Sequence, residues 1–185
     1  MKALILFLLM CSSSLAATIN IGAVAMNDTT GYYLKEDQSF NTTGKIRVGS
    51  FSISEDSIKA MIASWGSEAP TYNEYASLNS YFKEVGVGGD SGGIVTGWSF
   101  TTNGTVAGTT TNVNTSYIAA NSQLYVWAFN QSSYTKTDFN TNSQWALVTS
   151  TNWLVPPIGT KSLNLAVVTS QDVLLGTDLS PVSNS

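Results

Sequence analysis

The stretch Leu124-Tyr125-Val126-Trp127-Ala128-Phe129 decides the fold, because all six of its side chains are apolar or aromatic. Successive side chains of a β-strand point to opposite faces of the sheet, so this strand has no face suited to water. Such a run is not typical of an edge strand but of a central strand that is covered on both sides. We therefore predict a sheet that is buried on both of its faces.

Further strand and turn patterns lie on both sides of this stretch. Asn103-Gly104 is typical of a hairpin turn, and the apolar alternation changes phase at Gly49, where we expect a bulge or kink. The other expected strands cover residues 18–26, 32–34, 45–53, 94–102, 105–111, 144–149 and 163–169. This spacing predicts a mainly β chain, folded as an antiparallel β-sandwich or partly open barrel of about eight strands.

A change of period predicts a two-helix insertion near residues 54–85 that caps one sheet face or one open end of the fold. Ser54 is the expected N-cap of the first helix. The apolar face of that helix is formed by Ile58, Met61, Ile62 and Trp65. Thr71 and Glu74 form a capping box for the second helix, which we expect to run to Gly86. The apolar face of the second helix is formed by Leu78, Tyr81, Phe82 and Val85.

Residues 1–17 predict a secretory signal, followed by a single β-rich domain with its helical insert over residues 18–185. Lys2 is the positive start, residues 3–10 are apolar, and Ser14-Leu15-Ala16 gives the small residues for cleavage before Ala17 or Thr18. The apolar run is too short to span a bilayer. We therefore predict a secreted, extracellular protein, with the periplasm or the cell surface as alternatives. Lipidation of Cys11 is a second route to the surface, although the bulky Met10 does not fit a lipobox.

The composition excludes several chemistries. The chain has no histidine and, apart from Cys11, no cysteine, which removes histidine-dependent catalytic triads and zinc sites of the Cys/His type. The formal net charge is −4 and Arg47 is the only arginine, so no basic face is available for nucleic acid. We predict no catalytic residues, no metal ligands, no cofactor and no nucleic-acid partner. The sequence does not identify the ligand-binding residues.

One motif imitates an active site. Gly89-Asp90-Ser91-Gly92-Gly93 has the sequence that surrounds the nucleophile of chymotrypsin-like serine proteases. In those enzymes a histidine accepts the proton of the serine, and this chain has none. We therefore interpret the motif as a glycine-rich turn between a helix and a strand.

Several aromatic segments resemble a family of secreted proteins. The segments are Gly97-Trp98, residues 121–130, residues 144–150, Trp153 and Pro156, preceded by Gly49-Ser50-Phe51. Together they resemble the small secreted β-rich bacterial exoproteins that often carry PEP-CTERM sorting tails. The apolar segment and basic end of such a tail have no counterpart in residues 176–185, so the resemblance implies export and not necessarily anchoring. It implies no activity for any residue.

Three functions remain open, and we favour the first. It is a secreted, non-enzymatic extracellular or cell-surface module with a structural, matrix or adhesion role, which binds polysaccharide or associates with itself through strand edges. The second is a carbohydrate-binding β-sandwich module, whose platform would be Tyr125, Trp127 and Phe129 if they are exposed. The third is a hydrolase that uses carboxylates alone, but Glu36-Asp37 and Glu55-Asp56 are typical of solvated loop and helix-start charges.

Overall fold

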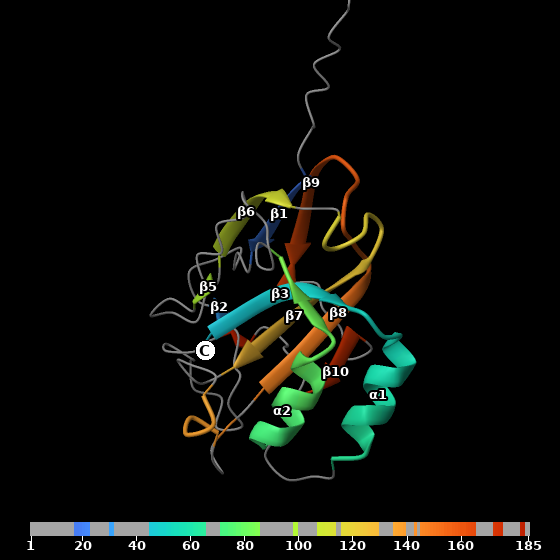
Figure 1. Ribbon diagram of the computed structural model, residues 1–185. Coiled ribbons are helices and arrows are strands. Elements are labelled where there is room, and N and C mark those ends of the chain that lie inside the picture. The colour runs from blue at the N-terminus through green and yellow to red at the C-terminus, as the bar shows by residue number, and fades with distance from the viewer. Residues whose placement is uncertain are drawn as a thin grey trace, which may run out of the picture.

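A computed structural model gives the arrangement of the elements (Figure 1). It describes residues 17–22, 30–31, 45–65, 71–85, 98–99, 107–113, 116–129, 135–139, 143, 145–165, 172–175 and 182–183. The predicted signal up to residue 16, Cys11 within it, the Glu36-Asp37 pair and the glycine-rich motif at residues 89–93 lie outside these residues. The predictions made for them therefore stay predictions.

The larger sheet contains the predicted central strand. Its strands run in the order β10-β8-β7-β3-β4 with antiparallel neighbours, and β5 pairs with the start of β3. β7 lies between β3 and β8, and every residue of Leu124–Phe129 is buried, which confirms the central strand. The bounds of these strands are Lys45–Phe51 (β3), Phe82–Glu84 (β4), Trp98–Ser99 (β5), Gln123–Phe129 (β7), Trp145–Leu154 (β8) and Val173–Leu175 (β10).

A smaller sheet has the order β6-β1-β9. Its strands are Ala17–Gly22 (β1), Ala107–Val113 (β6) and Gly159–Asn164 (β9). β1 pairs antiparallel with β6, but parallel with β9, in an unbroken register from Ala17 opposite Gly159 to Gly22 opposite Asn164. A third, short antiparallel pair joins β2 (Thr30–Gly31) and β11 (Val182–Ser183).

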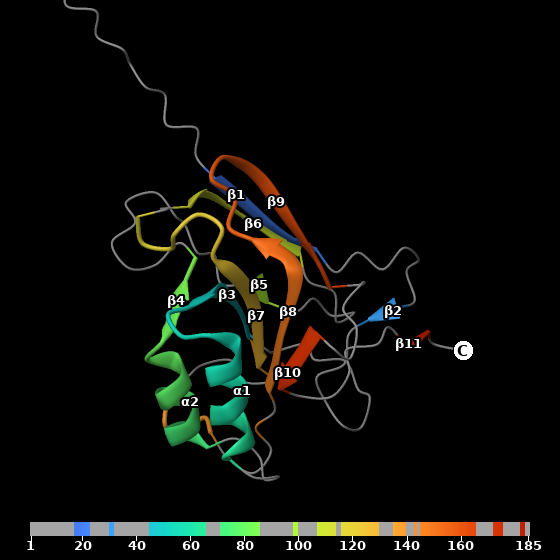
Figure 2. The same ribbon diagram turned by 90° about the vertical axis from the view of Figure 1, so that its right-hand side faces the viewer.

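The two larger sheets share an aliphatic core. In Figure 2 the smaller sheet lies on one side of β3, β7 and β8, and the helices lie on the other. One face of β7 enters this core with Leu124, Val126 and Ala128, none of them more than 5% exposed. The other members include Ile19, Ile21, Ile46, Val48, Ala146, Val148, Trp153 and Leu163.

The opposite face of the larger sheet carries an aromatic core under two helices, α1 (Glu55–Ala63) and α2 (Tyr72–Asn79). Tyr125, Trp127 and Phe129 of β7 are buried in it. Helices of this length are not stable alone in water, so burial of their apolar side chains must hold them in place. The side chains that they contribute are Ile58, Tyr75 and Leu78, with Met61, Ile62, Trp65 and Tyr72 partly buried around them. The predicted insertion therefore covers one sheet face.

The second helix ends earlier than the sequence predicts. α2 stops at Asn79, and Phe82–Glu84 form strand β4, which pairs with the end of β3. The expectation of one helical face through Leu78 and Phe82 to Gly86 is therefore wrong. The Phe82 ring packs 4.9 Å from the ring of Phe51, and β4 gains backbone hydrogen bonds with β3, which outweigh a few further helical residues. Both predicted N-caps, Ser54 and Thr71 with its capping box, are confirmed.

Gly49 has a different role from the expected bulge. The pairing of β3 with β7 ends at Gly49, opposite Tyr125, and the pairing of β3 with β4 begins at Gly49, opposite Glu84; neither pairing has a shift of register. A Cβ atom at this position would lie 2.2 Å from the carbonyl oxygen of Lys83 and 2.7 Å from the Phe82 ring. Glycine is therefore required for the close approach of β4. The change of phase in the sequence arises because β3 is buried on both faces.

The fold class is confirmed at the level of a mainly β chain with two helices and an antiparallel principal sheet. The parallel pairing of β1 with β9 departs from the all-antiparallel expectation, and the described strands do not confirm an eight-strand sandwich. The Asn103-Gly104 turn and the residues next to it lie outside the described residues, so the expected hairpin stays a prediction. Of the strands expected on either side of the turn, the described parts pair with other strands, β5 with β3 and β6 with β1.

Candidate functional site

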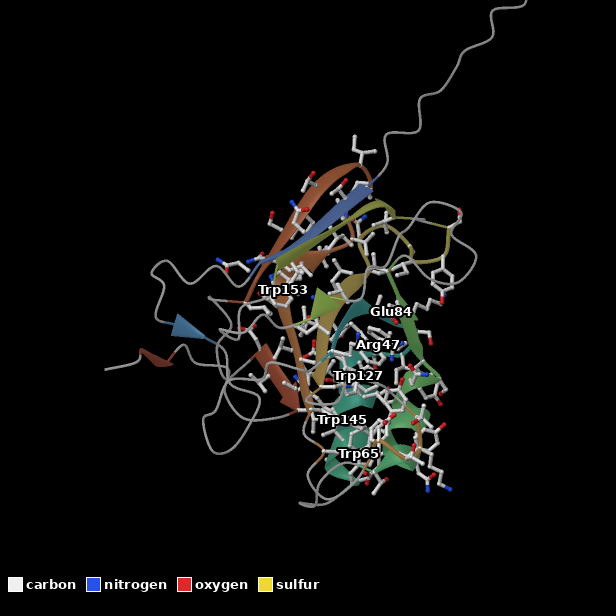
Figure 3. All side chains as sticks on the ribbon, turned by 90° about the vertical axis from the view of Figure 1, so that its left-hand side faces the viewer. Arg47, Trp65, Glu84, Trp127, Trp145 and Trp153 are labelled. Carbon is white, nitrogen blue, oxygen red and sulfur yellow. The ribbon has the colours of Figure 1, made fainter. Side chains whose placement is uncertain are left out.

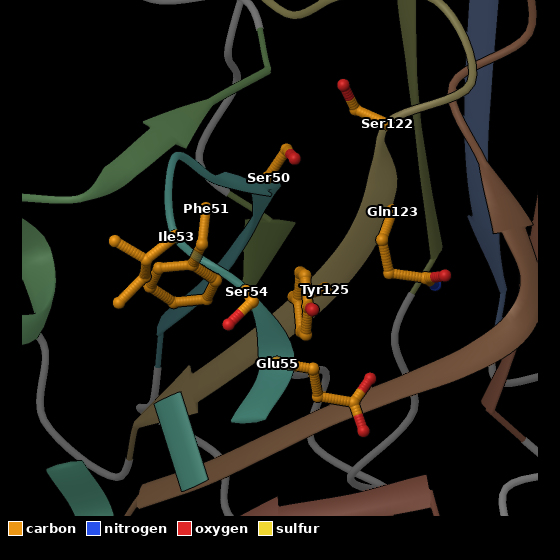
Figure 4. A pocket seen from close by; sticks show the side chains of 8 residues that line it. All are labelled: Ser50, Phe51, Ile53, Ser54, Glu55, Ser122, Gln123 and Tyr125. Atoms are coloured by element: carbon orange, nitrogen blue, oxygen red, sulfur yellow. The ribbon is translucent and has the colours of Figure 1, made fainter. Parts of the chain in front are cut away.

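A pocket of about 320 Å³ opens where β3 ends, α1 begins and β7 begins (Figure 4). We call it the corner pocket. Its walls combine hydroxyl groups, one carboxylate and one amide with apolar and aromatic side chains. They are Ser50, Phe51, Ile53, Ser54, Glu55, Ser122, Gln123 and Tyr125.

The first wall is built by the start of α1. The Ser54 hydroxyl caps the helix by accepting a hydrogen bond from the Ser57 amide at 3.2 Å. Glu55 follows in the first turn, where the helix dipole favours a negative charge, and its Oε1 lies 2.6 Å from Lys59 Nζ. The cap and this ion pair hold the carboxylate at the edge of the pocket.

The second wall is built by the start of β7, beside an irregularity in β8. Gln123 lies opposite Leu154, whereas Tyr125 lies opposite Thr149, so β8 carries extra residues at this point. The Gln123 Nε2 group donates to the carbonyl oxygens of Ser150 at 2.7 Å and Trp153 at 3.0 Å. Both carbonyl groups lie in the part of β8 where the register shifts. The Gln123 amide therefore stabilises the bend through which β8 leaves the larger sheet, and its position is fixed.

Two hydroxyl groups in the pocket belong to side chains that are otherwise buried. Ser50 is 5% exposed and Tyr125 is 3% exposed, and neither hydroxyl has a hydrogen-bond partner among the described residues. Burial raises the pKa of Tyr125 to about 12, and the charge of Glu55 adds to this shift. Tyr125 is therefore a neutral hydroxyl at physiological pH. Among the described residues, neither hydroxyl oxygen is one of the fully buried polar atoms that lack a partner. Both residues line the open pocket, so the two hydroxyls are available to water or a ligand.

A second polar cluster surrounds Arg47 on the aromatic face (Figure 3). Its Nε donates to Glu84 Oε2 at 2.8 Å, and its Nη1 donates to the Tyr75 hydroxyl at 3.2 Å and to Asn79 Oδ1 at 2.6 Å. The guanidinium carbon lies 4.8 Å from the centre of the Phe82 ring. These contacts join β3 to β4 and α2, so the cluster helps to hold α2 on the sheet.

The residues that the sequence offers as a sugar platform do not form one. Trp127 and Phe129 are 0% exposed, and both pack against other rings in the aromatic core. Tyr125 lies with them, and only its hydroxyl end borders the corner pocket. Of the Glu55-Asp56 pair, Glu55 lines the pocket and Asp56 does not.

Sequence reasoning missed the corner pocket because its walls come from two segments about 70 residues apart. A signal was present in each segment. Ser50, Ser52 and Ser54 alternate at the end of a strand, and Asn121-Ser122-Gln123 precedes the most apolar stretch of the chain. Only the pairing of Gly49 with Tyr125 brings the two segments together.

No protein-family model, curated protein or solved structure matches this chain. The resemblance to PEP-CTERM-type exoproteins therefore stays a prediction. Within the described residues, neither helix has the length and apolar character needed to cross a membrane. In the same part of the chain, no three acidic, cysteine or histidine side chains lie together in a way that suits a metal ion.

Proposed function

We propose that the chain is a secreted, non-enzymatic extracellular or cell-surface module with a structural, matrix or adhesion role. One observation carries this proposal. The outer end of β8 and the edge strand β9 carry several small polar side chains that are exposed to solvent. The exposed members are Thr151, Asn152, Thr160, Ser162 and Asn164. We call this the polar strand face.

The polar strand face suits contact with a hydrated partner. Its hydroxyl and amide groups donate and accept hydrogen bonds without the desolvation cost of a charge. Two exposed apolar side chains lie next to these polar residues: Leu154, at 37%, is the last residue of β8, and Ile158, at 58%, lies just before β9. A mixture of polar groups and a few apolar anchors is typical of protein contact surfaces.

The edge of β9 is guarded against pairing with other strands. Among the described strands β9 pairs only with β1, so its outer edge faces no other described strand. Lys161 is half-buried on the same side of the strand as the buried Leu163. Lysine side chains on edge strands oppose strand addition. This favours contact through the polar strand face over self-association through this edge.

The proposal extends to the finer architecture and to export. The aliphatic core common to the two sheets supports a β-sandwich as the framework of the module. Ala17 is 1% exposed and pairs with Val113 and Gly159, so cleavage before Ala17 would preserve β1 in full. For this reason we favour cleavage before Ala17 over cleavage before Thr18.

The two other functions have weaker support. A carbohydrate-binding module loses its expected platform, because Trp127 and Phe129 lie in the core, although the corner pocket offers a different location. A carboxylate-only hydrolase needs two acids across a cleft. Glu55 is the only acid that lines the corner pocket, and it is paired with Lys59.

The experiment expresses the full chain in an exporting bacterial host and measures how the mature protein divides between the medium and the cell-surface and matrix fractions. In one variant, Thr160→Glu with Ser162→Glu places two charges on the polar strand face. The control, Asn73→Glu with Ser77→Glu, places the same charges on the exposed side of α2. We expect the first variant to shift to the medium and the control to behave as the unmodified chain.

Two results would overturn the proposal. The first is an equal shift, or no shift, in both variants, because the polar strand face would then have no special part in retention. The second is turnover of a substrate by the purified chain in a panel of polysaccharide and ester hydrolysis assays. Mass spectrometry of the exported protein checks the expected start at Ala17.

A further inference from the structure

We infer that the corner pocket binds one unit of a neutral saccharide. The inference names a ligand for the proposed extracellular module, but it depends on different residues from the polar strand face. Its volume of about 320 Å³ lies at the lower end of the range of about 300–1,000 Å³ for small-molecule sites. A pocket of this size, open to solvent, is suited to a single ring and not to an extended ligand.

The polar groups of the pocket match a ligand rich in hydroxyl groups. The buried residues Ser50 and Tyr125 offer hydroxyls that have no partner among the described residues, and a hydroxyl both donates and accepts. Gln123 uses its Nε2 group on β8, so its Oε1 remains as an acceptor. A sugar presents several hydroxyls on one ring, and each of these groups can pair with one of them.

The charge in the pocket selects against an acidic ligand. Glu55 is the only ionisable group of the lining besides Tyr125, and Tyr125 is neutral. A carboxylate or phosphate on the ligand would face the Glu55 carboxylate across the pocket, and the two negative charges would repel each other. A cationic ligand would have to displace Lys59, which lies 2.6 Å from the same carboxylate. A neutral ligand meets neither cost.

The apolar part of the lining completes the match. Phe51 and Ile53 form one side of the pocket, and the Phe51 ring packs edge-on against the Tyr125 ring at 5.0 Å between centres. This contact holds both rings still. Sugars carry C–H groups as well as hydroxyls, and a fixed aromatic and aliphatic wall gives those groups a place to lie.

The test titrates the isotope-labelled mature protein with D-glucose, D-galactose and D-mannose, followed by nuclear magnetic resonance of the backbone amides. D-glucuronate serves as the acidic probe. We expect at least one neutral sugar to shift the signals of residues 50–55 and 122–125, and we expect D-glucuronate to bind at least tenfold more weakly. The variant Tyr125→Phe keeps the ring and removes the hydroxyl, and we expect it to weaken binding about three- to tenfold.

Asp56→Asn is the matched control for Glu55→Gln, because Asp56 is exposed and does not line the pocket. We expect Glu55→Gln to weaken binding of the neutral sugar and to reduce the discrimination against D-glucuronate, while Asp56→Asn changes neither. The inference is wrong if none of the neutral sugars shifts the pocket signals, or if Asp56→Asn has the same effect as Glu55→Gln. Retention through the polar strand face is measured separately, so failure here leaves that proposal intact.

Discussion

The two faces of β7 bury the same number of side chains but form different cores. Leu124, Val126 and Ala128 face the smaller sheet in a mainly aliphatic layer, in which Trp153 is the buried aromatic member. Tyr125, Trp127 and Phe129 face the two helices among other aromatic rings. The side-chain size on each face therefore matches the kind of layer that covers it.

The difference has a physical origin. Small branched and aliphatic residues allow two pleated sheets to approach to about 10 Å. Two short helices on a sheet leave gaps between and beside the cylinders, and large rings fill them. The ring centre of Trp127, for example, lies within 6.0 Å of five other ring centres, those of Phe51, Tyr75, Phe82, Phe129 and Trp145.

The aromatic face also accepts a charge that the aliphatic face lacks. Arg47 extends between the rings of Phe82 and Trp127, where the negative faces of the rings attract a cation. Its ion pair with Glu84 compensates for the loss of water. The helical cover is therefore fixed by an electrostatic contact as well as by burial of apolar surface.

The largest expected effect comes from removing the centre of the aromatic face. Trp127→Ala deletes the ring that touches five others, and we expect the free energy of unfolding to fall by about 3–5 kcal/mol. Urea denaturation followed by circular dichroism measures the change. Tyr81→Ala removes an aromatic ring that is 37% exposed and should cost much less. Equal costs for the two variants would show that the aromatic face is not the main support of the helices.

The sequence predicts this contrast only in part. Six apolar residues in succession identify β7 as a central strand, and the caps at Ser54 and Thr71 identify the helix starts, because these signals act within one turn or one strand. The sequence alone does not show which layer meets which face. That depends on the parallel pairing of residues 17–22 with 159–164, and no local pattern encodes a contact across such a distance.

A matched pair of leucines sharpens the comparison. Leu124 on the aliphatic face and Leu147 on the aromatic face are both 0% exposed, so the two Leu→Ala changes remove the same atoms. Each should cost about 2–5 kcal/mol, and the cost depends on how far the surroundings close the cavity. A short helix can shift as a unit, whereas strands held in a ladder cannot. We therefore expect Leu124→Ala to cost more.

The measurement is again urea denaturation, with both variants compared under the same conditions. An equal cost, or a higher cost for Leu147→Ala, would mean that the helices are held as rigidly as the smaller sheet. In that case the Arg47 cluster, which joins α2 to the sheet, would be a candidate for the additional restraint.

Glu84→Gln tests the charge on the aromatic face. The change keeps the shape of the side chain but removes the negative partner of Arg47, and both side chains are at most 18% exposed. We expect a loss of about 1.5–3 kcal/mol, the range for hydrogen bonds to charged groups. Glu55→Gln removes the exposed pair with Lys59 and should cost much less, because solvent screens an exposed ion pair. Similar losses in the two variants would contradict a structural role for the buried pair.

The candidate site was less predictable than the fold. Glu55 is visible in the sequence as a helix-start acid, and Tyr125 as a core residue, and both descriptions are correct. Their common border on the corner pocket follows from the pairing of β3 with β7 and from the irregularity in β8 that Gln123 stabilises. The role of Gln123 can be recognised only when the irregularity of β8 that its amide group stabilises is known.

The smallest expected effect is confined to alkaline pH and concerns the residue where the aromatic face meets the corner pocket. Burial and the charge of Glu55 raise the pKa of Tyr125 to about 12, whereas an unfolded tyrosine ionises near pH 10. Above about pH 10 the unfolded chain loses this proton before the folded chain does. The stabilisation is therefore complete below pH 10 and is lost as the pH rises towards 12.

Tyr125→Phe removes this ionisation. The urea midpoint of the variant should therefore fall less steeply between pH 10 and 12 than the midpoint of the unmodified chain. For each protein, the midpoint near pH 7 is the reference. In Glu55→Gln the folded-state pKa of Tyr125 should fall slightly, because the repelling charge is gone while burial, the larger cause, remains. The alkaline decline should therefore still begin near pH 10 but end at a lower pH than in the unmodified chain. Parallel alkaline slopes for Tyr125→Phe and the unmodified chain would mean that the Tyr125 hydroxyl is as well hydrated in the folded as in the unfolded state. The corner pocket would then hold more water than its lining suggests, and Tyr125 would not belong to the dry aromatic core that the rest of this face of β7 forms.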